Sequence, residues 1–125
     1  MAMLLDAGAL IAYDRGDQHT VAAIELARRH HTPVRTTTSV VAQVWRNGTR
    51  QARLARLLIG IDERFLSIEA SRAVGVLLAA AATADVIDAS LIEIANEGDE
   101  VMTSDPEDLA HLAEAAGKRL IIRPV

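Results

Sequence analysis

Hydrophobic and polar positions along the chain predict short strands separated by helices. Apolar or β-branched runs indicate strands at Met1–Leu5, Val34–Thr37, Phe65–Ile68, Glu100–Thr103 and Leu120–Arg123. Between them, helical spacing predicts helices over Ala7–Tyr13, Gln18–His30, Ser39–Arg46, Ala70–Ala82 and Asp85–Asn96, and after Thr49 and Asp105. Strands that alternate with helices from end to end are typical of a three-layer α/β domain with a mainly parallel central sheet.

Residues that start or stop helices support several of these boundaries. Asp17 and Thr49 suit the N-cap positions of the helices that follow them. Pro106 suits the first position of the last helix, and Gly117 suits its end. No linker, repeat or low-complexity tract interrupts the pattern, so residues 1–125 are expected to form a single domain.

Composition excludes several classes of function. The absence of cysteine excludes a disulfide scaffold, a zinc–thiolate site and thiol catalysis. The start of the chain lacks the features of a signal peptide, and the longest apolar stretch, Val74–Ala82, is too short to cross a membrane. A net charge of −4 disfavours nucleic-acid binding through overall charge, and three aromatic residues disfavour a base-stacking platform. A cytoplasmic protein without a membrane partner is therefore expected.

Two aspartates follow predicted strands directly. Asp6 comes after the apolar run that ends at Leu5, and Asp105 comes soon after Thr103. Ligands of open parallel sheets gather at the carboxyl ends of the strands, so both carboxylates are candidates for a functional site. Each of them also suits the ordinary role of a helix cap.

A second acidic pair lies on the predicted helix Asp85–Asn96. Asp85 and Asp88 are three residues apart and therefore share one face of the helix. Asp88 adjoins the apolar stripe formed by Ile87 and Leu91, so it is expected to point toward protein. A lone carboxylate in that place is costly unless it is paired, protonated or bound to a metal, and no arginine or lysine lies between Arg72 and Lys118.

A divalent cation is the simplest partner for these aspartates. Oxygen ligands without histidine or cysteine suit Mg²⁺ or Mn²⁺ rather than Zn²⁺. Such an ion lowers the pKa of a water and offsets charge on a phosphate undergoing attack. The predicted chemistry is metal-assisted hydrolysis of a phosphodiester.

Four segments together resemble the PIN-domain family, specifically the VapC-type toxin ribonucleases. They are Leu4-Leu5-Asp6-Ala7, Ala42-Gln43-Val44-Trp45-Arg46, Asp85-Val86-Ile87-Asp88-Ala89 and Thr103-Ser104-Asp105-Pro106-Glu107-Asp108-Leu109. The resemblance spans the whole chain. It implies a three-layer PIN-like fold and a Mg²⁺- or Mn²⁺-dependent endoribonuclease that acts with a metal-activated water. It also implies neutralisation by a VapB-type antitoxin and pairing as a homodimer.

The resemblance also implies roles for individual residues. Asp6, Asp88 and Asp105 match acidic catalytic and metal-binding positions of the family, and Asp85 matches an additional acidic position found in part of it. The family usually has glutamate where this chain has Gln43. Glutamine can offer a carbonyl oxygen but carries no charge. Either Asp85 supplies the missing charge, or the protein is a catalytically weakened PIN protein that acts mainly as an antitoxin-binding or regulatory partner.

Candidate contacts to the RNA substrate come from the helices near Gln43 and from the residue before Asp105. Arg46 lies almost one turn after Gln43, Arg50 begins a row of arginines, and Ser104 precedes the last aspartate. These side chains suit phosphate binding beside an acidic site. A solvated helix face is the usual explanation of such a row of arginines, and helix capping explains Ser104 at least as well.

Other folds that gather aspartates or bind nucleotides fit less well. A receiver-like phosphoacceptor needs an acidic pair at the first strand, where this chain has Asp6 alone. A haloacid-dehalogenase-type phosphatase needs a second aspartate where Gly8 stands. The glycine-rich turn of Rossmann and P-loop nucleotide binders is absent.

Overall fold

Five parallel strands form the central sheet of the computed structural model, which describes all residues from 1 to 125. The strands are β1 (Met3–Leu5), β2 (Val34–Thr37), β3 (Asp62–Arg64), β4 (Glu100–Thr103) and β5 (Ile121–Pro124). They lie in the order β3-β2-β1-β4-β5, and every neighbouring pair is parallel. The sheet is thus wholly parallel, where the sequence predicts a mainly parallel one.

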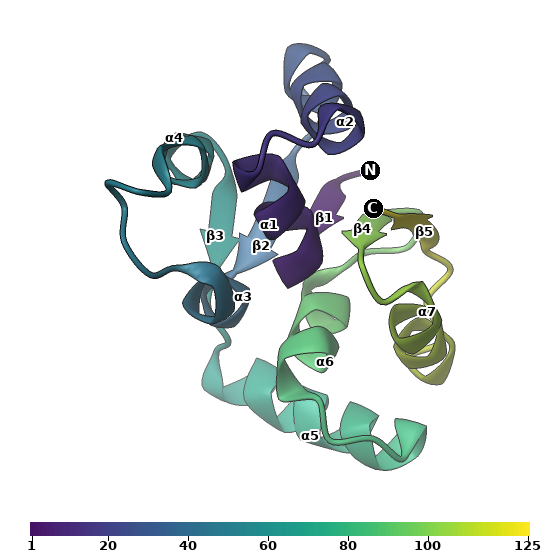
Figure 1. Cartoon of the computed structure of the whole chain (residues 1–125). Coiled ribbons are helices and arrows are strands. Elements are labelled where there is room, and N and C mark those ends of the chain that lie inside the picture. Colours follow the sequence, from purple (N-terminus) through teal and green to yellow (C-terminus); the bar gives the residue numbers. More distant parts are fainter.

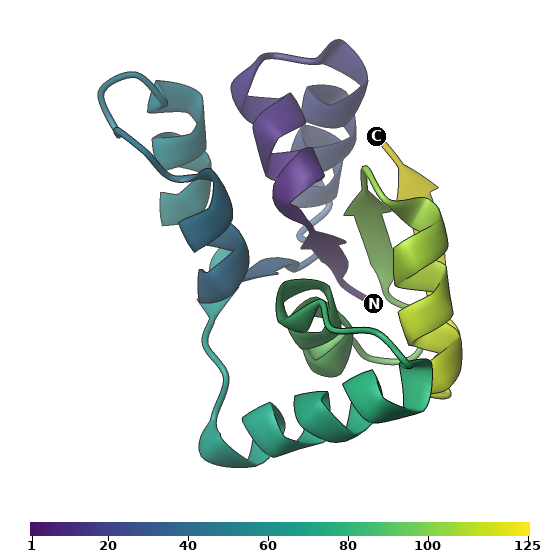
Figure 2. The same ribbon diagram turned by 60° about the horizontal axis from the view of Figure 1, so that its bottom comes forward.

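Helices cover both faces of the sheet and complete the three layers (Figure 1). One layer holds α1 (Ala7–Asp14), α2 (Gln18–Arg29), α3 (Thr38–Val44) and α4 (Ala52–Ile59). The other holds α5 (Ile68–Ala81), α6 (Val86–Ile94) and α7 (Pro106–Ala115). Figure 2 shows α5 running beneath α6, against which it packs. The predicted α/β architecture is confirmed.

The central strand β1 joins the two hydrophobic cores. Alternate side chains of a strand point to opposite faces, so Leu5 enters the core under α1–α4 and Leu4 enters the core under α5–α7. Both leucines are fully buried. Burial of each contributes roughly 1.5–3 kcal/mol to stability. The apolar run at the start of the chain therefore fixes the middle of the sheet.

The strand order creates a switch point between β1 and β4. The chain first adds β2 and β3 on one side of β1, and later adds β4 and β5 on the other side. At such a point the connections that leave the two strands diverge, which opens a crevice at their carboxyl ends. Asp6 follows β1 and Asp105 follows β4 closely, so the fold brings two predicted site residues to this crevice.

The third strand differs from the prediction. The sequence predicts it at Phe65–Ile68, but β3 is Asp62–Arg64, and Phe65 and Ile68 are 78% and 73% exposed. An edge strand can be polar because its side chains face water. Asp62 accepts hydrogen bonds from Arg35 of β2 and from Arg64, which stabilises the pairing without apolar burial.

The start of α4 also differs from the prediction. Thr49 does not cap the helix, which begins at Ala52 and has no side-chain cap at Gln51. Instead, Oδ1 of Asp14 at the end of α1 accepts a hydrogen bond from the N–H of Leu54 at 3.1 Å. The cap comes from forty residues away, which no local pattern reveals.

The connection from α3 to α4 is held by the side chain of Gln51. Its Oε1 accepts hydrogen bonds from the N–H groups of Arg46 and Asn47, and its Nε2 donates to the carbonyl of Val44. Because the backbone is extended at Trp45, α3 ends at Val44 rather than at the predicted Arg46. Arg46 therefore lies on an ordered connection and not on a helix.

Most other predicted helix ends are confirmed within one or two residues. Asp17 caps α2 by accepting a hydrogen bond from the N–H of Thr20. Pro106 occupies the first turn of α7, and Gly117 follows that helix with a φ of +67°, a conformation that favours glycine. Local capping chemistry determines these ends.

No single helix is both long enough and apolar enough to cross a bilayer. Only α5 and α6 taken together reach that length and composition, and the pair is bent by 114°.

Asp99 is predicted to be the most sensitive structural carboxylate. It is 2% exposed, and its two oxygens accept hydrogen bonds from the N–H groups of Ala2 (2.7 Å) and Asn96 (2.8 Å). We expect Asp99→Ala to lower the free energy of unfolding by about 2–4 kcal/mol, because one buried and one partly buried N–H group lose their partner. Urea denaturation will measure the loss, with exposed Glu114→Gln as control. Equal stability of both variants would contradict this structural role.

Candidate active site

Asp6 lies at the base of the crevice, where it links β1 to the connection between β4 and α7. It is only 3% exposed. Its Oδ1 caps α1 by accepting a hydrogen bond from the N–H of Ala9 at 2.8 Å, and its Oδ2 accepts one from the N–H of Ser104 at 3.2 Å. Burial raises the pKa of Asp6, and the hydrogen bond with Thr103 is the largest opposing effect. Asp6 therefore caps α1 and also holds the segment after β4 through a hydrogen bond.

Asp105 presents a carboxylate with no structural partner. It occupies the N-cap position of α7, but its side chain makes no capping hydrogen bond. Its N–H instead donates to Oγ1 of Thr103 at 2.8 Å. The capping interpretation thus fails for Asp105, and its exposed carboxylate remains available to a ligand.

Asp85 and Asp88 project from the first turn of α6. Asp85 is exposed and caps this helix, since its Oδ1 accepts a hydrogen bond from the N–H of Asp88 at 3.0 Å. Asp88 is half-buried and forms no ion pair. The predicted lack of a basic partner for Asp88 is confirmed.

The pKa of Asp88 shows that the four carboxylates share one electrostatic environment. This pKa is raised from 3.8 to about 7, mainly by burial and then by the negative charges of Asp85, Asp6 and Asp105, in that order of importance. Like charges have this effect only over short separations. The fold thus brings together four aspartates that are up to 99 residues apart in the chain.

The donor chemistry of this acidic cluster (Asp6, Asp85, Asp88 and Asp105) suits a hard divalent cation. All the donors are carboxylate oxygens, and none of the four carboxylates forms an ion pair with a cationic side chain. Mg²⁺ prefers such ligands and keeps several water molecules. The side chains as they stand form no group of three or more that could hold a metal ion, so binding requires rotation of the more exposed ones.

An open hollow of about 370 Å³ adjoins the acidic cluster. It is lined by the residues from Ser104 to Asp108, at the start of α7. Glu107 and Asp108 add negative charge to the first turn of this helix, where the helix dipole favours it. The approach to Asp105 is therefore wide, polar and accessible from solvent.

Gln43 lies on α3, which packs against both α1 and α6. Its side chain is exposed and makes no hydrogen bond with the acidic cluster. The helix that carries it thus contacts α1, which Asp6 caps, and α6, whose first turn holds Asp88. Its place beside these helices is consistent with the predicted fourth position, but its carboxamide does not take part in the cluster.

The three predicted RNA-binding residues occupy different surroundings. Arg46 donates hydrogen bonds to the carbonyls of Ala42 (3.3 Å) and Trp45 (2.7 Å), so its guanidinium folds over the end of α3. Arg50 is exposed and unpaired on the connection before α4. Ser104 is exposed beside Asp105, and its backbone holds Asp6. Ser104 alone adjoins the acidic cluster directly.

Gly8 is a site residue that the sequence-based predictions do not include. It lies in the first turn of α1, and a Cβ atom added there would overlap both Oγ and Cβ of Ser104. Its backbone is not in the left-handed region, so close approach alone explains the glycine. The only signal in the sequence is a glycine in a predicted helix, where alanine is favoured by about 0.5–1 kcal/mol.

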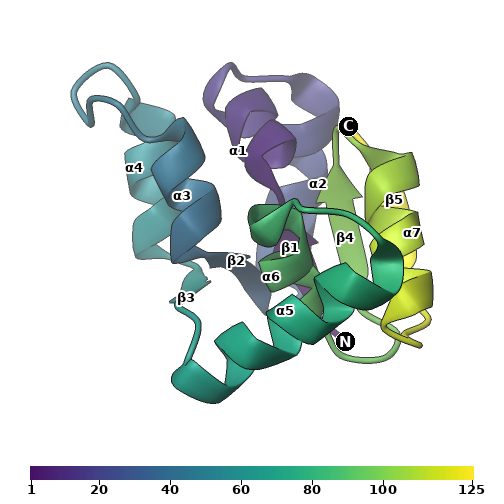
Figure 3. The same cartoon turned by 90° about the horizontal axis from the view of Figure 1, so that it is seen from below.

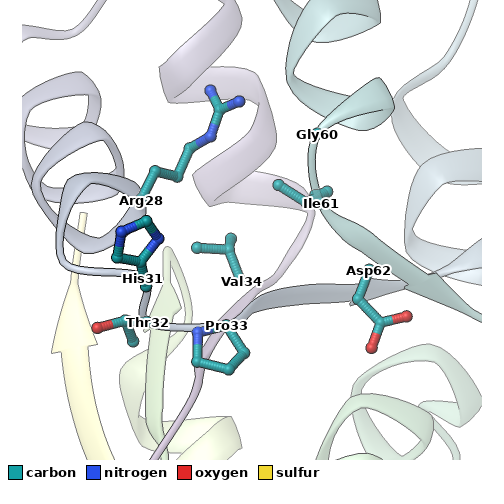
Figure 4. A pocket seen from close by; sticks show the side chains of 8 residues that line it. All are labelled: Arg28, His31, Thr32, Pro33, Val34, Gly60, Ile61 and Asp62. Carbon is teal, nitrogen blue, oxygen red and sulfur yellow. The ribbon is translucent and has the colours of Figure 1, made fainter.

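A second pocket lies on the α1–α4 side of the molecule, at the start of β2. Its volume is about 350 Å³, and Figure 4 shows Arg28 and His31 on one side of it and Asp62 on the other. Its charges are already paired, because Arg28 contacts Glu25 and Asp62 contacts Arg35. This pocket is separate from the carboxyl ends of the strands and holds no predicted site residue.

Comparison with solved structures gives the context of this arrangement. The chain is similar to a chain in the crystal structure of VapBC2 from Rickettsia felis, which is bound to a DNA fragment from their promoter. The TM-score is 0.73 at 13% sequence identity, and the alignment covers 100% of this chain and 99% of the other. The fold is PIN-like. No protein-family model and no curated protein matches the sequence.

At this identity the similarity establishes the fold alone. The PIN-like fold that the sequence predicts is therefore confirmed, over the full length of both chains. The roles of Asp6, Asp85, Asp88, Asp105 and Gln43 stay predictions.

The raised pKa of Asp88 predicts an unusual dependence of stability on pH. The folded protein holds the Asp88 proton up to about pH 7, whereas the unfolded chain releases it near pH 4. Stability should therefore fall as pH rises from about 4 to about 7, by roughly 1–3 kcal/mol after allowance for solvent screening. Thermal melts of the metal-free protein between pH 5 and pH 8 will measure this loss.

Asp88→Asn is the matched variant for this prediction. It should flatten the pH dependence and raise the metal-free melting temperature at pH 8, because one of four crowded charges is removed. Glu114→Gln removes an exposed charge on α7 and should leave the dependence intact. A lower melting temperature for Asp88→Asn at pH 8 would show that Asp88 is a structural partner instead.

Gly8→Ala should destabilise the protein although alanine is the better helix former. We expect a loss of about 1–3 kcal/mol, because the new methyl group forces Ser104 and its hydrogen bond to Asp6 to move. Gly75→Ala in α5 is the control, since a Cβ there meets nothing within 4 Å and should stabilise. Adding Ser104→Gly to Gly8→Ala should recover most of the loss. Stabilisation by Gly8→Ala alone would refute the close contact.

Proposed function

We propose that the protein is a Mg²⁺- or Mn²⁺-dependent endoribonuclease that acts in the cytoplasm as the toxin of a toxin–antitoxin pair. The observation that carries this proposal is the acidic cluster at the switch point of a PIN-like fold. The charges of Asp85, Asp6 and Asp105 all act on Asp88, no basic side chain forms an ion pair with it, and its pKa is raised to about 7. A cation bound at the cluster would offset the energetic cost of these crowded and partly buried carboxylates.

Asp6, Asp85, Asp88 and Asp105 would hold the ion. When bound, Mg²⁺ or Mn²⁺ supplies a more acidic water and offsets negative charge on the phosphodiester. The chain's own residues do the rest. Asp6 is fixed by the N–H groups of Ala9 and Ser104 and gives the site a rigid base. Asp88 and Asp105 have free carboxylates that can turn toward a ligand.

The proton of Asp88 is part of this proposal. Near neutral pH about half of the metal-free molecules hold it, because the pKa is about 7. A cation at the cluster favours the ionised carboxylate, so binding should release this proton and strengthen as pH rises. Mn²⁺ affinity measured by titration calorimetry at pH 6 and pH 8 should show the difference.

The proposed partner is a VapB-type antitoxin that places a cationic side chain, most simply an arginine, in the acidic cluster. A guanidinium group suits adjacent carboxylates because it forms two parallel hydrogen bonds. The hollow beside Asp105 leaves room for such a side chain. A PIN-like chain of this kind is also proposed to pair as a homodimer.

The decisive experiment is cleavage of a panel of RNAs with Mn²⁺, with Mg²⁺ and with EDTA. We expect cleavage only with metal, and none from Asp88→Asn, whereas Glu114→Gln should cleave like the wild type. Titration calorimetry of the same proteins with Mn²⁺ should show weaker binding for Asp88→Asn. Metal-independent cleavage, or full activity of Asp88→Asn, would overturn the assignment.

Gln43 favours a second candidate function, a weakened PIN protein that acts mainly by binding its antitoxin. Glutamine supplies no charge, and its side chain makes no hydrogen bond with the cluster. If Gln43 faces the bound metal, Gln43→Glu should raise Mn²⁺ affinity by about ten-fold and lower the melting temperature without metal, because an anion is added beside others. Unchanged affinity and stability would mean that Asp85 takes the fourth role and that the wild type is fully competent.

A further inference from the structure

Charge is distributed very unevenly between the two helical layers. The segment from Ala7 to Gly60, which forms α1–α4 and β2, has eight arginines and three carboxylates. The segment from Ile61 to Val125 has five cationic side chains and thirteen carboxylates. The net charge of −4 therefore conceals a basic layer on one face of the sheet. A polyanion would be attracted to that layer and repelled by the other.

The arginines of the basic layer are mostly unpaired. Seven of the twelve arginines in the chain form no ion pair, and six of these seven lie between Ala7 and Gly60. They are Arg15, Arg29, Arg46, Arg50, Arg53 and Arg56. Arg72 on α5 is the remaining one. None of these six guanidinium groups is held by a carboxylate, although Arg46 donates hydrogen bonds to the carbonyls of Ala42 and Trp45.

Three of these arginines line a groove between α2 and α4. The groove has a volume of about 450 Å³, and Arg29, Arg53 and Arg56 face it together with Glu25. Glu25 is the one anion in the groove. Its carboxylate accepts hydrogen bonds from the hydroxyl of Tyr13 and the guanidinium of Arg28, and its charge also interacts with that of Arg29. The groove thus presents three guanidinium groups that form no ion pair and a single carboxylate that is shared with Arg28.

The walls of the groove are fixed before any ligand binds. Asp14 joins the end of α1 to the start of α4 through the N–H of Leu54. A Cβ atom at Gly16 would overlap the guanidinium of Arg53, so this arginine lies directly against the turn between α1 and α2. Gly16 has a φ of +77°, which gives a second reason for glycine there. A prepared site loses less entropy on binding.

The groove and the acidic cluster lie at opposite ends of the same helix. Asp6 precedes α1 and Tyr13 lies in its last turn, so the helix of eight residues separates them by about 12 Å. Figure 3 shows α1 between α4 and α2. Arg46 and Arg50 on the connection from α3 continue the row of cations along α4. An extended polyanion could therefore contact the groove and reach the acidic cluster.

We propose that the groove between α2 and α4, with Arg29, Arg53 and Arg56, binds the phosphate backbone of single-stranded RNA. This proposal rests on the proposed ribonuclease function and names how the substrate is held. Arginine suits phosphate because its guanidinium donates two parallel hydrogen bonds. The groove offers no free aromatic face, since Tyr13 is buried and engaged with Glu25, so it holds phosphates and not bases.

The test measures binding without cleavage. Fluorescein-labelled 12-nucleotide poly(U) RNA is titrated with protein in EDTA, and anisotropy gives the dissociation constant at several salt concentrations. Arg29→Gln/Arg53→Gln/Arg56→Gln should lose about ten-fold in affinity at low salt. The slope of log affinity against log salt should fall by about 2, since each phosphate contact to a single strand contributes roughly 0.7. The loss should be similar for other RNA sequences.

Single substitutions provide the controls. Arg53→Gln should weaken binding, whereas Arg72→Gln, which removes the same charge from α5, should not. Arg53→Lys should recover only part of the affinity, because it restores the positive charge but not the two parallel hydrogen bonds of a guanidinium group. All these side chains are exposed, so equal melting temperatures are expected and will confirm folding.

The outcomes separate this proposal from the proposed nuclease activity. Equal loss from Arg53→Gln and Arg72→Gln, or no loss in the triple variant, overturns the groove as an RNA site. So does a triple variant that keeps RNA affinity but no longer binds a purified antitoxin, because the groove then serves the protein partner. Arginine-dependent RNA binding supports the groove even if the wild type cleaves no RNA, in which case only the nuclease proposal fails.

Discussion

The buried carboxylate of Asp6 is the interaction on which the rest of the site depends. One oxygen caps α1 and the other holds the N–H of Ser104, so a single side chain joins the two layers where β1 and β4 end. The contact is tight enough that Gly8 has no room for a side chain. Because Asp6 is fixed by the backbone, the positions of Asp105 and of the crevice follow from it.

The same arrangement has an electrostatic cost. Burial and the charges of the other three aspartates of the cluster raise the pKa of Asp88 to about 7. Folding of α5, α6 and α7 against one face of β1 must overcome this repulsion, and the fully buried side chains of that core, such as Leu91 and Ile92, contribute the opposing free energy. Sites that are costly to the fold are commonly functional, and this cluster fits that principle.

The two layers carry opposite charge. The layer of α5–α7 is acidic and carries Asp85, Asp88 and Asp105, whereas the layer of α1–α4 carries most of the unpaired arginines. An acidic cluster repels the phosphates of a nucleic acid, so in the proposed function the basic surface at the other end of α1 would offset this repulsion. Asp14 and Gln51 have a part in this division because they fix the start of α4 and the connection that precedes it.

Local sequence determined much of this protein. Alternation of apolar runs with helical spacing was sufficient for the layered fold, and Asp17 and Pro106 were sufficient for two helix starts, because capping acts over a few residues. The sequence also predicted that Asp88 forms no ion pair, because no arginine or lysine lies near it in the chain.

Tertiary structure alone decided three features. The third strand is the polar segment Asp62–Arg64 and not the predicted apolar segment Phe65–Ile68, because an edge strand can pair with β2 without a buried face. Asp14 capped a helix forty residues away. Arg29 and Arg53 met across one groove, because contacts between distant segments depend on how helices pack and not on the pattern of either segment.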